Sequence, residues 1–161
     1  MRTSLIRLTM AGAFIATLCL LALPFKAEAR MGLGYFDSDN LTLEGDNVSG
    51  LYSVKKDWAQ VFFGVYNTND SLSFSIGGAY KFTVWGDQYA GLHVGPGIAM
   101  GTANDNFLFS AFGLAGFHYT IFDSVMLSLD GGPILTLVND EVNFSLEPTG
   151  NLLGLSIHYL F

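Results

Sequence analysis

Five titratable side chains stand in stretches of otherwise small or apolar residues, and they are the groups in this chain that could do chemistry together: Lys81, His93, His118, Asp130 and His158. Imidazoles are good ligands for zinc and copper, so one interpretation is a three-histidine metal site. The other, which we favour, is a buried polar cluster in which Asp130 accepts from His118 or His158 and from Lys81, because unpaired polar groups are costly to bury. We therefore assign no catalytic residue, cofactor or metal.

The segments that carry these residues alternate with a period of two, as β-strands do. In residues 71–82 one face holds large apolar side chains and the other holds small ones: Leu72, Phe74, Ile76, Gly78, Tyr80 and Phe82 against Ser71, Ser73, Ser75, Gly77, Ala79 and Lys81. Lys81 and Asp130 both fall on the face of small and polar residues. The alternation therefore predicts strands whose two faces meet different environments.

Eight antiparallel strands are expected, near residues 31–43, 48–55, 58–66, 71–83, 89–100, 107–120, 124–137 and 151–161. The turns KKD, WGD and FDS are tight, and the links between them along the chain are longer or more polar. Residues 79–98 also resemble residues 116–135, a shift of 37 positions that indicates repeated hairpins. The even count and short connections predict an all-β, up-and-down barrel with both ends on the short-turn side.

The first 29 residues have the features of a secretory signal peptide. Arg2 and Arg7 precede an apolar run over residues 10–25, and small residues at Ala27 and Ala29 suit a signal peptidase. We expect cleavage before Arg30 and a single barrel domain over residues 30–161. The only cysteine, Cys19, lies in the signal, so the mature domain has no disulfide.

Charge favours a membrane barrel over a soluble one. Only 13% of the residues are charged, against roughly 25% in ordinary soluble domains, and mean hydropathy is +0.40. A lipid-facing wall must be uncharged, whereas a water-facing wall would be rich in charge. An interfacial girdle of aromatic residues is expected near the tight turns, formed by Trp58, Phe82, Trp85, Tyr89, Tyr119, Phe122, Tyr159 and Phe161.

The final ten residues, LLGLSIHYLF, end on Phe161 with apolar residues at each second position before it, Tyr159 included. This pattern resembles the closing strand of bacterial outer-membrane β-barrels, and over residues 30–161 the chain resembles small eight-stranded members such as the OmpA transmembrane domain and OmpX-like proteins. The resemblance implies an outer-membrane location, contact with outer-membrane lipid and recognition of Tyr159 and Phe161 by the barrel assembly machinery. We expect a monomer.

An enzyme is the alternative outside the structural class. Residues 142–161 are similar to the end of lipid A deacylases of the PagL type, whose His-x-Ser-Asn motif supplies a base and a nucleophile. The corresponding run is Asn143-Phe144-Ser145-Leu146, which lacks the histidine, so we read Ser145 as a loop serine. A narrow channel for small solutes is the alternative within the membrane class. We favour a non-enzymatic structural or surface-interaction role.

Acidic residues gather on the longer-loop side. The mature domain has four bases and thirteen acids, and nine of those acids are expected in or beside the longer loops: Asp37, Asp39, Glu44, Asp46, Asp70, Asp105, Asp140, Glu141 and Glu147. Such loops would suit divalent cations or a basic partner. They exclude nucleic acid, whose phosphates require the opposite charge.

Overall fold

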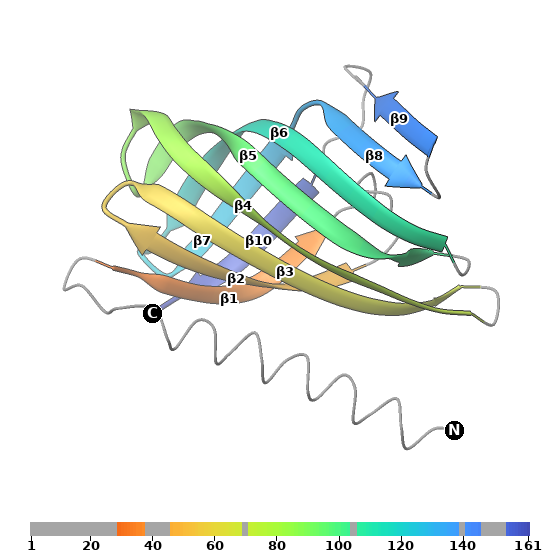
Figure 1. Ribbon diagram of the computed structural model, residues 1–161. Coiled ribbons are helices and arrows are strands. Elements are labelled where there is room, and N and C mark those ends of the chain that lie inside the picture. The colour runs from red at the N-terminus through yellow and green to blue at the C-terminus, as the bar shows by residue number, and fades with distance from the viewer. Residues whose placement is uncertain (1–28, 38–45, 69–70, 104–105, 139–140, 146–153) are drawn as a thin grey trace.

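The computed structural model describes residues 29–37, 46–68, 71–103, 106–138, 141–145 and 154–161 (Figure 1). In these residues no helix is both long and apolar enough to span a bilayer. Ten strands are present: β1 (Met31–Asp37), β2 (Asp46–Val54), β3 (Asp57–Thr68), β4 (Ser71–Gly86), β5 (Ala90–Ala103), β6 (Asn106–Ile121), β7 (Val125–Gly131), β8 (Ile134–Val138), β9 (Glu141–Ser145) and β10 (Gly154–Leu160).

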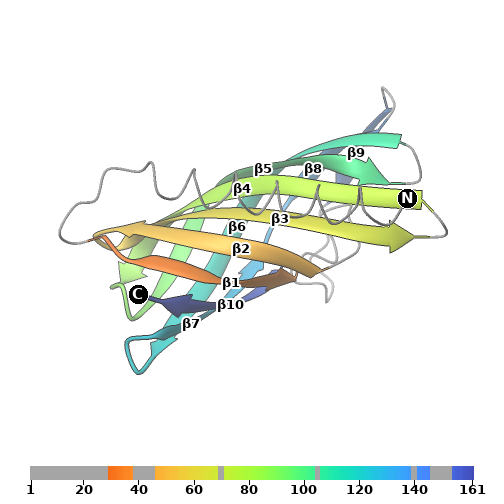
Figure 2. The ribbon, with the colours of Figure 1, turned by 90° about the horizontal axis from the view of Figure 1, so that it is seen from below.

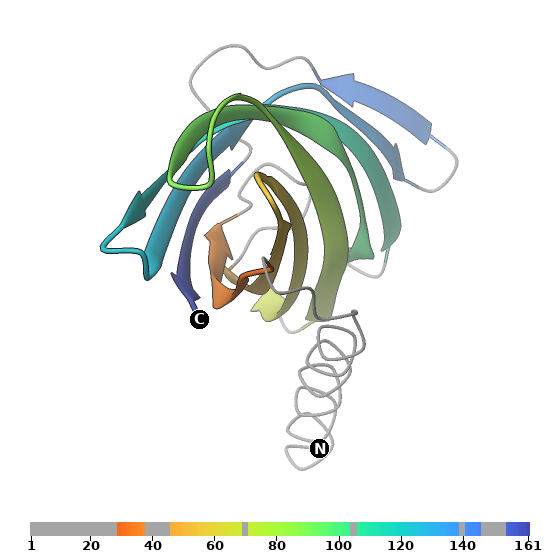
Figure 3. The same cartoon turned by 90° about the vertical axis from the view of Figure 1, so that its left-hand side faces the viewer.

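Eight of these strands close into an antiparallel barrel, which confirms the predicted architecture. β1 to β6 follow one another around the wall, and β7 and β10 complete it (Figure 3). β10 pairs with β1 from Gly32↔Leu160 to Asp37↔Leu155, and the two strands lie side by side in Figure 2. Beyond the ladder, the Phe161 amide donates to the Met31 carbonyl at 2.8 Å. The last strand therefore closes the barrel on the first.

The predicted strand at 124–137 is two strands, because Pro133 has no N–H to continue the ladder. β7 and β8 both pair with β6, and the Gly113 amide donates to the Pro133 carbonyl at 3.0 Å across the break. Of the two, only β7 pairs with β10. Past the break, β8 pairs instead with β9, a strand that lies where we expected a loop. The β8–β9 hairpin extends beyond the barrel wall at the end opposite the C-terminus (Figure 1).

The outside of the wall is apolar, as the alternation predicted. Ile76, Phe82, Ile98, Leu129 and Ile157 are each more than 40% exposed. The expected girdle residues are exposed too, with one exception: Trp58 is fully buried and packs inside the barrel with Leu51, Met126 and Leu160. Trp58 was wrongly placed in the girdle because it lies on the inward face of β3, the face it shares with Gln60 and Phe62.

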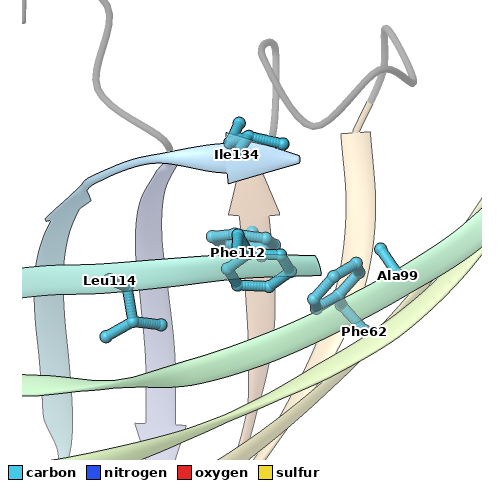
Figure 4. Packing of buried hydrophobic residues seen from close by; sticks show 6 residues of the cluster. Phe62, Ala99, Phe112, Leu114 and Ile134 are labelled. Carbon is cyan, nitrogen blue, oxygen red and sulfur yellow. The ribbon is translucent and has the colours of Figure 1, made fainter. Parts of the chain in front are cut away.

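A second apolar layer fills the lumen farther from the short turns. It consists of Phe36, Phe62, Ala99, Phe112, Leu114 and Ile134, five of which are labelled in Figure 4. The three phenylalanine rings lie over glycines of neighbouring strands. A Cβ built on Gly77, Gly97 or Gly154 would be 2.1–2.3 Å from the ring of Phe62, Phe112 or Phe36 respectively. Eight strands enclose just enough room for side chains, so each ring requires a glycine beneath it.

We predict that Gly97→Ala destabilises the barrel by about 1–3 kcal/mol, the usual cost of overpacking, because the new methyl would overlap the Phe112 ring. Gly131→Ala is the matched control, since a Cβ there has no atom within 4 Å. Urea unfolding of the protein refolded in detergent measures both. Equal midpoints for the two variants would contradict the ring-on-glycine packing, and Phe112→Leu should recover part of the loss in the Gly97→Ala background.

Candidate functional site in the barrel lumen

The five predicted polar residues all face the lumen, each from a different strand. Lys81 comes from β4, His93 from β5, His118 from β6, Asp130 from β7 and His158 from β10. None is more than 2% exposed. They lie between the two apolar layers, so water is excluded from both sides of the cluster.

Asp130 is the centre of the cluster. Its Oδ2 accepts from Lys81 Nζ at 2.7 Å and from Ser128 Oγ at 3.1 Å, and its Oδ1 lies 2.5 Å from His93 Nε2. The ion pair with Lys81 was predicted. The histidine partner was not: His93 occupies the position that we expected for His118 or His158. An ionised carboxylate that meets two basic groups and a hydroxyl is well compensated for its burial.

Gly116 makes this contact possible. β6 separates β5 from β7, and Gly116 is the β6 residue that pairs with both His93 and Asp130. A Cβ at Gly116 would lie 2.6 Å from Asp130 Oδ1 and 2.7 Å from His93 Nε2. The two side chains therefore meet over a backbone that has no side chain of its own.

A chain of contacts continues from His93 toward the short-turn end. His93 Nδ1 lies 3.3 Å from His118 Nδ1, and the two rings are stacked with centroids 5.5 Å apart. His118 Nε2 donates to the Asp87 carbonyl at 2.8 Å. The Nε2 atoms of the two rings thus face the acceptors at either end of this chain, and the two Nδ1 atoms face each other.

The turn between β4 and β5 folds over the barrel mouth, where two residues of β6, His118 and Thr120, hold it by hydrogen bonds. Besides the His118 contact, Thr120 Oγ1 donates to the Gln88 carbonyl at 3.2 Å, and the Thr120 amide donates to the Tyr89 carbonyl at 2.6 Å. Asp87 Oδ1 accepts from the amides of Tyr89 and Ala90. Those amides lower the pKa of Asp87, so this exposed carboxylate stays ionised.

His158 belongs to a second set of contacts. Its Nε2 lies 2.9 Å from Ser49 Oγ, which also accepts from Gln60 Nε2 at 3.0 Å and donates to the Val61 carbonyl at 3.1 Å. Because the hydroxyl proton is already used at Val61, His158 must donate through Nε2. Its Nδ1 is then a buried lone pair with no hydrogen-bond partner.

The three histidines therefore do not converge on one point. His93 and His118 stack on each other, and His158 bonds to Ser49. Among the residues that the structure describes, no group of three histidine, cysteine or acidic side chains could hold a metal ion. The geometry favours the polar cluster over the three-histidine site.

Sequence reasoning missed the small residues that complete the cluster. Ser128 joins Lys81 to Ser156, with contacts of 3.1 Å and 2.7 Å. Ser128 and Ser156 lie two positions before Asp130 and His158, respectively. Because residues two apart on a strand share a face, the alternation already predicts that both serines face inward. The repeat of 37 residues also aligns Lys81 with His118 and His93 with Asp130, and all four proved to face inward.

The other predicted site residues lie apart from the lumen. Tyr159 and Phe161 are 60% and 71% exposed at the short-turn end. Of the nine acidic residues, Asp37, Asp46 and Glu141 are at strand ends, and Asp37 pairs with Asp46 across β1 and β2. The remaining six lie outside the described residues: Asp39, Glu44, Asp70, Asp105, Asp140 and Glu147.

Ser145, the serine considered as a nucleophile, is the last residue of β9 rather than part of a loop. Its ladder partner is Ile134. The three histidines of the chain are all in the lumen, with contacts to Asp130, Asp87 and Ser49.

Comparison of the chain with protein-family models, curated proteins and solved structures gives no match. We therefore infer the function from the sequence and from the geometry of the barrel itself.

We predict that Asp130→Ala lowers the free energy of unfolding by about 3–5 kcal/mol, because it leaves the Lys81 ammonium buried without its counter-ion. The double variant Lys81→Met with Asp130→Ala should recover most of this loss, since it removes the uncompensated charge. Ser110→Ala, which deletes a buried hydroxyl 3.2 Å from Thr136 Oγ1, is the control and should cost about 1 kcal/mol. Urea midpoints that rank the double variant below Asp130→Ala would overturn this account.

Proposed function

We propose that this protein is an outer-membrane β-barrel of a Gram-negative envelope, delivered by a cleaved signal peptide, with a closed lumen and a structural or surface-interaction role. The observation that carries the proposal is the separation of charge from the outer wall. Six charged residues occur in the ten strands. Four are at strand ends, namely Asp37, Asp46, Asp57 and Glu141, and the other two, Lys81 and Asp130, face the lumen.

This distribution supports a wall that faces hydrocarbon. Soluble domains of this size cover their surface with charged residues of both signs, whereas the outward side chains of this barrel are mostly leucine, isoleucine, valine and phenylalanine, with tyrosine and tryptophan near the short turns. A closed wall also satisfies every backbone group of the paired strands, which a bilayer requires.

The packing of the lumen favours a structural role over a channel. Two apolar layers enclose the polar cluster, and the cavity beside it, lined in part by Phe36, Phe62 and Phe112, has a volume of about 10 Å³. That is the lower limit for one water molecule. A solute would have to break the buried Lys81–Asp130 pair to pass.

An enzymatic role has less support. Asn143 stands where the deacylase motif has its histidine, and it is the ladder partner of Thr136. Surface interaction would depend on the longer loops, whose acidic composition suits divalent cations or a basic partner.

A charge on the outer wall tests the proposal. We predict that Ile98→Arg, at a wall position 54% exposed, destabilises the barrel in lipid bilayers by about 2–4 kcal/mol, the cost near the midplane. Phe122→Arg, in the β6–β7 turn at 92% exposure, is the control and should cost about 0–1 kcal/mol, as expected near an interface. If Ile98→Arg is as harmless as Phe122→Arg, the wall faces water and the membrane proposal is wrong.

Fractionation of cells gives an independent test. We predict recovery of the protein with outer membranes and a shift in gel mobility between unheated and boiled samples, because paired strands resist detergent. Planar bilayers containing the protein should show no stepwise conductance. Recovery in the soluble periplasmic fraction would contradict the membrane proposal, and reproducible conductance steps would favour the narrow channel.

A further inference from the structure

We propose that a basic groove at the short-turn end binds the phosphate of an anionic phospholipid. The groove is formed by Arg30, the β2–β3 turn with Lys55 and Lys56, and the β4–β5 turn with Asp87 and Tyr89, and it has a volume of about 510 Å³. This inference rests on the proposed membrane location, which places the groove at the depth of the lipid headgroups.

The three bases of the groove are all the bases of residues 30–161 except the buried Lys81. Their convergence comes from the fold, since Lys55 and Lys56 are 25 or more positions from Arg30 in the sequence. The Arg30 backbone nitrogen, which becomes the α-amino group after cleavage before Arg30, donates to Ser53 Oγ at 3.0 Å, and the Arg30 carbonyl accepts from the Ser53 amide at 2.8 Å. The backbone of Arg30 is therefore anchored to β2, next to the lysine turn.

The Arg30 guanidinium reaches from β1 to the β4–β5 turn, although β2 and β3 lie between them in the sheet. Its Cζ lies 5.2 Å from the centroid of the Tyr89 ring, a cation–π contact. The turn itself is held by His118 and Thr120. Both sides of the groove are therefore fixed by hydrogen bonds, the Arg30 side to β2 and the β4–β5 turn to β6.

Arg30 Nη1 is the observation that points to a ligand. This nitrogen is buried and has no hydrogen-bond partner. A guanidinium presents five donors in a planar fork that matches phosphate oxygens, so an unsatisfied Nη1 in a groove with two lysines is suited to a phosphate.

The lining of the groove has a net positive charge, although Asp57, Asp87 and Asp123 all lie at this end. Asp57 accepts from the Thr83 amide at 2.9 Å, and Asp87 accepts from the amides of Tyr89 and Ala90. Asp123 lies in the β6–β7 turn and is not among the lining residues of the groove. Of the groove residues themselves, three are cationic and Asp87 alone is anionic.

The lipid is favoured over a free anion because exposed aromatic side chains lie at the same end. Trp85, Tyr119, Phe122 and Tyr159 are each at least half exposed, and such residues settle at the headgroup level of a bilayer. A phosphate bound in the groove would then keep its acyl chains against the apolar wall. Basic side chains at a membrane surface attract anionic lipids in this way.

Binding of short-chain lipids to the folded protein in a zwitterionic detergent tests the inference. The probes are dihexanoyl phosphatidylglycerol, dihexanoyl phosphatidylcholine and inorganic phosphate, each below the concentration at which the lipids form micelles, and native mass spectrometry with thermal melts measures retention. We expect phosphatidylglycerol to be retained and to raise the melting temperature. We expect the other two probes to do neither.

Variants locate the site. Arg30→Gln, and separately Lys55→Gln with Lys56→Gln, should each weaken phosphatidylglycerol binding about tenfold, as expected for loss of charged hydrogen bonds. Asp87→Asn and Asp123→Asn each remove one negative charge from the same end, and the asparagine Oδ1 can still accept the two turn amides. Asp87→Asn should strengthen binding, whereas Asp123→Asn should leave it unchanged.

Three outcomes would overturn the inference. The first is equal retention of phosphatidylcholine and phosphatidylglycerol, and the second is phosphatidylglycerol binding by the Arg30 and lysine variants as tight as that of the unaltered protein. The third is inorganic phosphate binding as tightly as phosphatidylglycerol. Because these measurements use detergent, they do not depend on where the protein lies in the cell. Failure here with a large cost for Ile98→Arg in bilayers would reject the groove and leave the membrane proposal standing.

Discussion

The narrow interior of an eight-stranded barrel is the constraint on which the rest of this structure depends. A wall of eight strands leaves room for little more than its own inward side chains, so a large or charged group must be matched by a small one on a neighbouring strand. The phenylalanine rings lie over Gly77, Gly97 and Gly154. His93 and Asp130 meet over Gly116, where any side chain would separate them.

The same constraint explains why one ion pair can be buried here. A single charge is costly to bury without a partner. The small inward side chains of β7 and β10, Ser128 and Ser156, fit beside the ion pair and complete its contacts. The apolar layers above and below keep water out, which strengthens these contacts and also makes their loss costly. Apart from His158 Nδ1, the polar groups of the cluster have hydrogen-bond partners, which favours one packing of the lumen over others.

The polar lumen is also linked to the end of the barrel. The contacts from Asp130 through His93 and His118 end at the Asp87 carbonyl, in the turn that forms one wall of the basic groove. Packing in the lumen thus positions Tyr89 against Arg30. A filled lumen and a fixed turn at its mouth are consistent with a barrel that contacts other molecules at its ends and outer wall rather than in its interior.

The sequence by itself determined the class of the fold, the number of barrel strands and the side of the wall on which most residues lie. Alternation carries that information locally, since a strand turns successive side chains to opposite faces. It also marked Lys81, His93, His118, Asp130 and His158 as inward. The girdle assignment failed at Trp58, because an aromatic residue near a tight turn can face either side of a barrel wall. Alternation also missed the break before Pro133, because a proline interrupts a ladder without ending the wall.

Only the tertiary structure decided which inward residues meet. His93 rather than His118 or His158 pairs with Asp130, because the register of β5, β6 and β7 places Gly116 between them. Arg30 meets Tyr89 across two intervening strands, because the β4–β5 turn folds over the barrel mouth. Neither contact has a local signature, since strand register and barrel closure join residues that are far apart in the sequence.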